Sequence, residues 1–450
     1  MRTAPFPVVL LAHERAGRLN VTLTSLLHVR GIDRAQIFVL QDGNDEAVRG
    51  VVRAMGLMLV PLSEVAPLSS RTAHDAKSGK SIALAYRAAL STAFDVLTSD
   101  DALIVVEDDM LFSPDLMEFF LAGYHVMRGD RTLWCVSAWN DNGFRGMVNA
   151  RAAPRRLLRT GFFPGLGWLL TRKLYKGELE AVWPSEHWDH WMRSERVHRT
   201  SKGRECLYPH VPRAFHHGAV GTFMTKLNHA ESFAHIAYST DVRLTWPHAE
   251  WEALAGQLSA KAYEARLRAR LKEAVPLVDF ARLRRAFRRT AAAEAGGGPD
   301  GGAAEAEAAE VATVAIWYDM HPRSTVDKLW RDLAQLIGVW HEIRRAAHNG
   351  VHELWCGPSL ELLLVNMRHG PTGAPSPYAD LAPPPSSIFT TSAGLRKAAG
   401  AKGGSGLCRD TSRPLNVRED RLPPPRATKA SGSTHRRSIP PPRTATGHRR

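Results

Sequence analysis

Short apolar runs alternate with longer amphipathic stretches along the first quarter of the chain. The apolar runs 8–12, 37–40, 58–60 and 102–106 are expected to be buried strands. The stretches 19–28, 46–55 and 81–97 carry apolar residues at helical spacing. Strands and helices that alternate at these lengths predict an α/β fold, with a mostly parallel, doubly wound sheet and right-handed crossovers that place helices on both faces.

The run 102–106 leads directly into three carboxylates, Glu107, Asp108 and Asp109. Three charges buried without partners would each cost several kcal/mol, so we expect them at the exposed carboxyl end of the strand, facing a cation. Ligands bind at that end in open α/β sheets. A divalent ion that holds a diphosphate suits these ligands, because Mg²⁺ and Mn²⁺ take carboxylate and phosphate oxygens. A solvated acidic turn is the alternative.

Polar residues also follow the first two expected strands. Arg15 comes after 8–12, and Asp42 comes after 37–40. Together with the three carboxylates, these side chains would line one crevice at the edge of the sheet. The topology therefore predicts a nucleotide site without a glycine-rich loop.

From Thr132 onward the chain becomes aromatic and rich in loop residues. Its glycines would let backbone approach a ligand, and its tryptophans offer flat faces for sugar rings, although any single Trp is more often part of the core. Asp189, which lies between Trp188 and His190, is harder to explain as core. Its apolar neighbours favour a role as general base.

Composition divides the rest of the chain. We expect a catalytic domain over 1–245, a helical extension over 246–290, a low-complexity linker over 291–312, a small α/β domain over 313–390 and a basic, disordered tail over 391–450. The tail holds 14 Lys or Arg against 3 Asp or Glu, so it carries +11 of the formal net charge of +14. We therefore expect no specific nucleic-acid partner, and we expect deletion of 391–450 to leave activity intact.

The four cysteines, Cys135, Cys206, Cys356 and Cys408, show no CxxC spacing, which argues against a zinc site and leaves none, one or two disulfides open. No run of about 18 apolar residues would span a membrane. The stretch from Met1 to Leu11 is too short and too poorly flanked to be a signal peptide. Strand-like residues begin almost at Met1, which suggests an N-terminal truncation.

Four segments together carry a family resemblance: VVEDD (105–109), LWCVSAWNDNG (133–143), FFPGLGWLL (162–170) and WDHWMR (188–193). In this order and spacing they resemble the β-1,2-N-acetylglucosaminyltransferases, the family of GlcNAc-transferase I of N-glycan processing and the protein O-linked-mannose enzyme. The likeness is strong over 7–228. The likeness is weaker over 261–378. Both this region and the segment 213–221 resemble the O-mannose enzyme more than GlcNAc-transferase I.

The resemblance implies a GT-A-type fold, UDP-GlcNAc as donor, Mn²⁺ as cofactor and inversion at the sugar's C1. A mannose-terminated glycoprotein glycan would be the acceptor. By position, Asp109 would bind Mn²⁺, and Glu107 and Asp108 would contact the GlcNAc and ribose of the donor. Arg15 and Asp42 would hold the uridine and its phosphates.

The remaining implied roles concern the acceptor side and the compartment. Asp189 matches the catalytic base, and Trp188 would pack against the donor sugar. Cys135 and Cys206 match a disulfide pair, which would place the chain in an oxidising Golgi lumen, with membrane association through an anchor that this chain lacks.

Two residues depart from the pattern of relatives. Ala85 stands where a histidine would contact the uridine, and His190 stands where relatives have Asp or Met. Two other functions stay open beside an active transferase: a catalytically inactive, lectin-like relative, and a metal-dependent nucleotidyltransferase, although the latter would normally show a glycine-rich phosphate loop.

Overall fold

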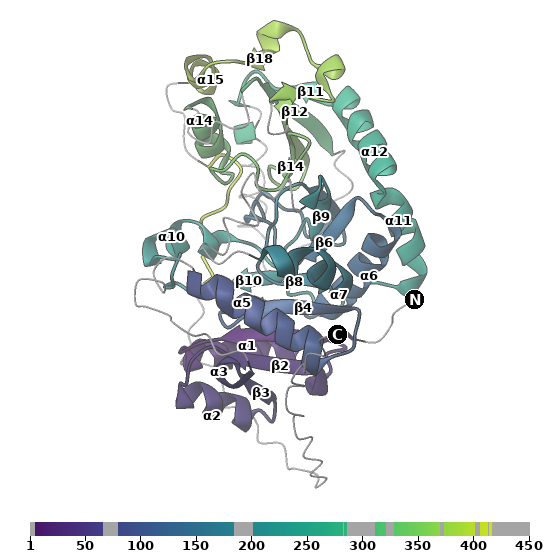
Figure 1. Ribbon diagram of the computed structural model, residues 1–450. Helices are drawn as coiled ribbons and strands as arrows, with labels where there is room; N and C mark the ends of the chain where they lie inside the picture. The colour runs from purple at the N-terminus through teal and green to yellow at the C-terminus, as the bar shows by residue number, and fades with distance from the viewer. Residues whose placement is uncertain are drawn as a thin grey trace.

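The computed structural model describes residues 5–65, 80–183, 201–281, 283–285, 311–320, 328–369, 373–400, 406–412 and 414–415 (Figure 1). Two sheets organise these residues, and helices pack around both. The predicted linker 291–312 lies almost wholly outside the described residues, and the predicted domain boundaries before residue 391 remain predictions.

The first sheet has the strand order β3-β2-β1-β4-β8-β6-β9-β7. Strands β1 (Val8–Ala12), β2 (Ile37–Gln41), β3 (Met58–Pro61) and β4 (Ala102–Glu107) run parallel and match the four predicted strands. Beyond β4, the sheet becomes mixed through β8 (Trp168–Thr171), β6 (Leu133–Ser137), β9 (Glu205–Pro209) and β7 (Leu157–Thr160). The predicted α/β fold class is confirmed.

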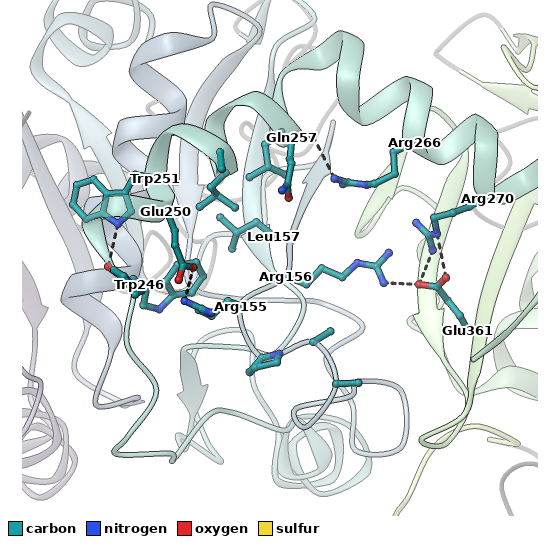
Figure 2. A pocket seen from close by; sticks show the side chains of 17 residues that line it. Arg155, Arg156, Leu157, Trp246, Glu250, Trp251, Gln257, Arg266, Arg270 and Glu361 are labelled. Carbon is teal, nitrogen blue, oxygen red and sulfur yellow. Dashed lines mark hydrogen bonds and ion pairs between the residues drawn. The ribbon is translucent and has the colours of Figure 1, made fainter. Parts of the chain in front are cut away.

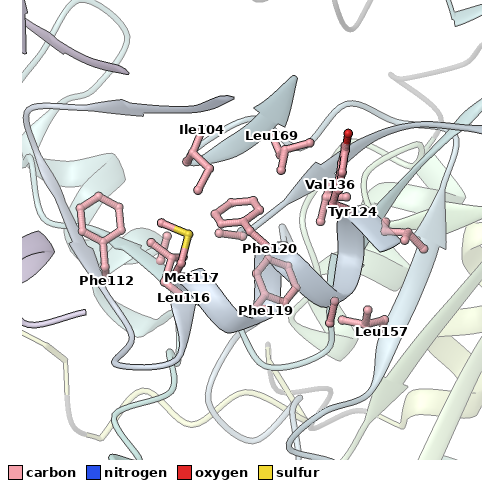
Figure 3. Packing of buried hydrophobic residues seen from close by; sticks show 14 of the residues in the cluster. Ile104, Phe112, Leu116, Met117, Phe119, Phe120, Tyr124, Val136, Leu157 and Leu169 are labelled. Carbon is pink, nitrogen blue, oxygen red and sulfur yellow. The ribbon is translucent and has the colours of Figure 1, made fainter. Parts of the chain in front are cut away.

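Helices cover both faces of this sheet because successive strand residues point to opposite sides. On one face, Ile104 and Val106 pack in a cluster with α1 (Ala16–Leu27), α2 (Glu46–Ala54) and α6 (Leu116–Gly129). Figure 3 shows the α6 side chains Phe119 and Phe120 near Ile104 and Leu169. On the other face, Leu103 and Val105 pack with α5 (Lys80–Thr92). The last turn of the helix predicted over 81–97 is a π-helix, Ala93–Leu97.

Cys135 on β6 and Cys206 on β9 are register partners, with their Cα atoms 4.7 Å apart, and they form the disulfide that the resemblance implies. Both cysteines are fully buried beside α5. The bond therefore joins two neighbouring strands inside the first sheet.

The second sheet is smaller and has the strand order β11-β12-β15-β14-β13, with β18 paired to β12. Its strands are β11 (Val275–Pro276), β12 (Ala312–Tyr318), β15 (Leu360–Asn366), β14 (Val351–Trp355), β13 (Ala347–His348) and β18 (Ile388–Phe389). Helices α14 (Lys328–Ile337) and α15 (Ser392–Ala399) pack together beside it. This arrangement agrees with a second, smaller α/β unit.

In its described residues, the helical extension expected over 246–290 contains two helices followed by a short strand. Helix α11 (Trp251–Leu258) packs on α6, and α12 (Ala260–Glu273) continues along the side of the molecule to the second sheet (Figure 1). Ser259 separates them because its backbone is extended, with ψ at 145°. Val275–Pro276 then pairs in parallel with β12.

Residues 406–412 and 414–415, which we call the C-terminal strap, correct the prediction that the disordered tail begins at 391. Cys408 forms a disulfide with Cys356, at the end of β14, and its N–H donates to the carbonyl of Ile337, at the end of α14. Further along, the N–H of Asp410 donates to the carbonyl of Arg145. The strap and α15 therefore belong to the folded structure, although their composition resembles that of the tail.

A buried histidine joins the two sheets. His348 on β13 places Nδ1 2.5 Å from Glu205 Oε1 on β9, and Nε2 3.0 Å from Glu264 Oε2 on α12. Burial alone would lower the pKa of His348, but the hydrogen bonds and charges of both carboxylates raise it to about 9. The imidazolium is thus the cation that offsets two partly buried carboxylates.

We expect His348→Gln to destabilise the protein more at pH 6 than at pH 9.5. The pKa of His348 in the folded protein is about 9, compared with about 6.5 for an ordinary histidine, so the stabilisation is complete below about 6.5 and is lost as the pH rises through about 9. A shift of this size corresponds to at most about 3 kcal/mol. Urea unfolding at the two pH values measures it, with the exposed His28→Gln as control. An equal loss at both pH values would mean lost packing instead of lost charge.

Candidate active site

The predicted site residues meet at one edge of the first sheet. Because β1 lies between β2 and β4, and Leu11 and Ala12 pair with Glu107 and Gln41, the carboxyl ends of all three strands lie side by side. Arg15 is the N-cap of α1. Asp42 directly follows β2, and its N–H donates to the carbonyl of Ala12, 2.8 Å away. The structure therefore places Arg15, Asp42 and the three carboxylates at this edge.

Asp108 and Asp109 are buried, which corrects the expectation that the carboxylates lie exposed and also excludes a solvated acidic turn. Their exposed fractions are 1% and 3%. The charges are tolerated because Arg15 pairs with both: Nη2 lies 2.5 Å from Asp108 Oδ1, and Nη1 lies 2.8 Å from Asp109 Oδ2. Arg18 Nη1 is 4.0 Å from the same oxygen of Asp109.

Glu107 has a different partner. The hydroxyl of Tyr86 on α5 donates to Glu107 Oε1 over 2.6 Å. The sequence pattern identified Tyr86 only as part of the apolar face of this helix. Ala85, the departure from the pattern of relatives, is its buried neighbour. Helix α5 therefore supplies one polar group to the site, beside the position where the family pattern has a histidine.

A second, short sheet holds the turn that carries Asp109. Strand β10 (Ala214–His216) pairs antiparallel with β5 (Met110–Phe112), with His216 opposite Met110. The N–H of His217 then donates to the carbonyl of Asp109 over 2.9 Å. Next in the chain, Gly218 packs so closely that a Cβ on it would lie 2.3 Å from Asp109 Oδ2.

The two oxygens of Asp109 differ in their surroundings. Oδ2 pairs with Arg15, whereas Oδ1 is buried and has no hydrogen-bond partner among the described residues. His216 Nε2 lies 3.4 Å from Oδ1. A buried carboxylate oxygen without a donor fits a cation, so Asp109 is the residue best placed to hold a divalent metal. Across the described residues, no group of three or more His, Cys, Asp or Glu side chains is arranged as a complete metal site.

The pKa values of the three carboxylates differ because each has a different balance of burial and neighbouring charges. Burial, reinforced by Asp109, raises the pKa of Glu107 to about 7. Burial also raises the pKa of Asp108 to about 6, although Arg15 opposes this shift. Burial would raise the pKa of Asp109 as well, but His216 and Arg15 outweigh it and lower that pKa. Burial lowers the pKa of His216 itself, so the permanent cations beside Asp109 are Arg15 and Arg18.

Trp188, Asp189 and His190 lie outside the described residues, so the assignments of the base and of the sugar-packing tryptophan remain predictions. Three other tryptophans of the aromatic region, Trp134, Trp139 and Trp168, are at most 5% exposed and belong to hydrophobic clusters. For these three, the interpretation as core residues is correct.

A cavity of about 700 Å³ lies away from the carboxylates, between residues 152–157 and helices α11 and α12 (Figure 2). Its two tryptophans already use their indole N–H groups: Trp246 donates to Asp115, and Trp251 donates to the carbonyl of Trp246. At the other end, Arg156 and Arg270 both pair with Glu361. The polar groups of this cavity mostly bind one another, so we assign it no part in the chemistry.

The buried, arginine-paired carboxylates lie at the carboxyl end of β4, the edge at which open α/β sheets bind nucleotides, as expected of a glycosyltransferase that uses a nucleotide sugar. A profile of the GNT-I family matches residues 1–289, and the chain belongs to that family. This confirms the resemblance carried by the four segments.

One relative is the alpha-1,3-mannosyl-glycoprotein 2-beta-N-acetylglucosaminyltransferase of Arabidopsis thaliana, which is 33% identical over 218 residues. The match covers 48% of this chain and 47% of the relative, so the chain spans about half the length of that protein.

Among solved structures, glucosyl-3-phosphoglycerate synthase from Mycobacterium tuberculosis, in complex with Mn²⁺, UDP and phosphoglyceric acid, is 15% identical with a TM-score of 0.24, over 37% of this chain and 55% of that one. The apo structure of the bifunctional glycosyltransferase WbbM is 10% identical with a TM-score of 0.27, over 45% and 38%. These likenesses are too weak to support an argument about ligands or function.

In the described ranges, no helix is long and apolar enough to cross a membrane.

Proposed function

We propose that this protein transfers GlcNAc from UDP-GlcNAc to a terminal mannose of a glycoprotein glycan, in β-1,2 linkage, with inversion and with Mn²⁺ as cofactor. The observation that carries the proposal is Asp109, a buried, ionised carboxylate with one unpartnered oxygen at the carboxyl end of β4. Membership of the GNT-I family and the name of the Arabidopsis relative support the same reaction.

The donor half of the proposed mechanism uses the described residues. Asp109 would hold the metal through its free oxygen, and Arg15 would remain beside it as a fixed positive charge. Bound there, the metal would neutralise the diphosphate as it leaves. Glu107 and Asp108 would bind hydroxyl groups of the donor, while Tyr86 orients Glu107. Asp42 would contact the uridine.

The acceptor half rests on Trp188 and Asp189. Asp189 would take the proton from the 2-hydroxyl of the mannose as that oxygen attacks C1 from the face opposite UDP. Trp188 would pack against the donor sugar and keep water away from it. No covalent intermediate is needed, because one attack with inversion completes the transfer.

We further propose that the reaction takes place in the Golgi lumen, with membrane attachment by analogy with the family. The disulfides Cys135–Cys206 and Cys356–Cys408 support an oxidising compartment. The weaker likeness over 261–378 favours an O-mannosyl acceptor over an N-glycan.

The test incubates the purified chain with Mn²⁺, labelled UDP-GlcNAc and either an O-mannosyl peptide or a high-mannose N-glycan. We expect transfer to one acceptor and loss of transfer in EDTA. Asp189→Asn should lower the rate by about 10²- to 10⁴-fold while UDP-GlcNAc binding, measured by calorimetry, is retained. The exposed Asp95→Asn serves as control.

Other outcomes would identify the alternatives. Glycan binding without transfer would indicate a lectin-like protein, and nucleotidyl transfer to a sugar phosphate would indicate a nucleotidyltransferase. Normal turnover of Asp189→Asn would show that the base is a different residue.

A further inference from the structure

At the acidic site, the buried Asp109 Oδ1 has no hydrogen-bond partner among the described residues, and His216 Nε2 faces it from 3.4 Å. The other ring nitrogen of His216, Nδ1, is also buried and unpartnered among those residues. Both residues are more than nine-tenths buried, with exposed fractions of 3% and 8%. A buried carboxylate oxygen that has no donor and faces an imidazole nitrogen leaves room for a ligand between them.

We propose that His216 is a second protein ligand of the divalent cation held by Asp109. The inference rests on the proposed function, since it concerns the metal of that site. Asp109 would contribute Oδ1 and His216 would contribute Nε2, while Asp109 Oδ2 stays with Arg15.

The separation of the two atoms suits neighbouring ligands of one ion. Two adjacent ligands of an octahedral ion lie about 3 Å apart when each metal–ligand distance is about 2.1 Å. The observed 3.4 Å is close to that value, so a cation could be bound by a small movement of either side chain. The same 3.4 Å is longer than a normal N–H···O hydrogen bond, which argues against His216 merely orienting the carboxylate.

The fold holds both ligands on paired backbone. His216 ends β10 and pairs with Met110, the residue that follows Asp109, and the next N–H, of His217, donates to the carbonyl of Asp109. The ring of His216 packs beside Phe233, with centroids 5.3 Å apart, and its carbonyl lies 3.2 Å from His229 Nε2. Two ligands fixed in this way need little reordering when the ion binds.

An imidazole ligand also predicts metal preference. Sites made only of oxygen ligands suit Mg²⁺, Ca²⁺ and Mn²⁺, whereas an imidazole nitrogen favours the later first-row metals. We therefore expect the protein to bind Co²⁺ more tightly than Mg²⁺ or Mn²⁺. This preference should decrease when the nitrogen is removed.

The decisive experiment is pulsed EPR of the full chain loaded with Mn²⁺, with and without UDP. A directly bound ¹⁴N nucleus modulates the Mn²⁺ echo, and growth on ¹⁵N-histidine should change that signal if the nitrogen belongs to a histidine. In His216→Gln the signal should disappear, and Mn²⁺ affinity, measured from the EPR signal of the free ion, should fall at least about tenfold. Glutamine is the matched change because it keeps a polar side chain of similar length and removes the imidazole nitrogen. The control is His235→Gln, since His235 is buried in the same region but lies beside Arg145 and Arg409.

The results separate this inference from the proposed function. Bound Mn²⁺ without a nitrogen signal in the unaltered protein, or a signal that persists in His216→Gln, would overturn the inference even if GlcNAc transfer is found. A histidine signal in a protein that transfers no sugar would uphold the ligand and refute the function. Isotope labelling needs no variant, so the test stands even if His216→Gln does not fold.

Discussion

Replacing Asp109 with asparagine should abolish Mn²⁺ binding and lower GlcNAc transfer by about 10³-fold. The substitution keeps the size of the side chain but removes the negative charge that the cation needs, and a metal that stabilises a leaving diphosphate contributes several kcal/mol to the transition state. The fold should survive, because Arg15 keeps its contact with Asp108. Transfer kinetics, Mn²⁺ titration by EPR and thermal unfolding measure the three effects.

Asp115→Asn is the matched control for this prediction. Asp115 is fully buried and pairs with an arginine, as Asp109 does, but its partners are Arg213 and the indole of Trp246. Its loss should lower the melting temperature while the folded protein keeps its specific activity. If both variants lost activity and stability together, Asp109 would be structural and the metal assignment would be wrong.

Gly218→Ala should lower transfer by about 10²-fold or more, although it adds only one methyl group. The new Cβ would lie 2.3 Å from Asp109 Oδ2 and 2.8 Å from Cγ, so the carboxylate would have to move away from Arg15. A displacement of about 1 Å in a catalytic group costs on the order of 10² in rate. We expect the loss in the rate of transfer together with weaker Mn²⁺ binding.

Gly221→Ala provides the comparison within the same loop. A Cβ there would meet Arg15 Nη1 at 3.8 Å and Met224 Cβ at 3.9 Å, both ordinary contacts. Its activity should stay within about threefold of the unaltered protein, given the usual small effect of such changes. Equal losses at 218 and 221 would point to general sensitivity of the loop instead of crowding at Asp109.

Sequence patterns predicted the elements of the sheet far better than their pairing. Apolar runs identified β1, β2, β3 and β4 to within a residue or two, because buried parallel strands are nearly continuous hydrophobic segments. The insertion of β8 between β4 and β6 was not predicted. Strand order is set by contacts between distant residues, and local composition says little about such contacts.

The same limit applies to the site. The acidic triplet and Arg15 could be predicted because they lie at, or within three residues of, the end of an apolar strand. Tyr86 and His216 could not, since each meets its carboxylate only through the tertiary fold. His216 lies in 213–221, where the sequence shows a family likeness but no sign of a contact with Asp109. The burial of Asp108 and Asp109 was also missed, because it depends on that unseen arginine pairing.

The C-terminal strap decides where the chain can be shortened. Removal of everything after 390, which composition alone would recommend, would delete α15 and leave Cys356 with an unpaired, oxidisable thiol beside the core. A recombinant protein made without the basic tail should instead keep the chain through Leu415, whose N–H donates to the carbonyl of Ala234. A purification tag should follow Leu415, where it leaves both disulfides in place.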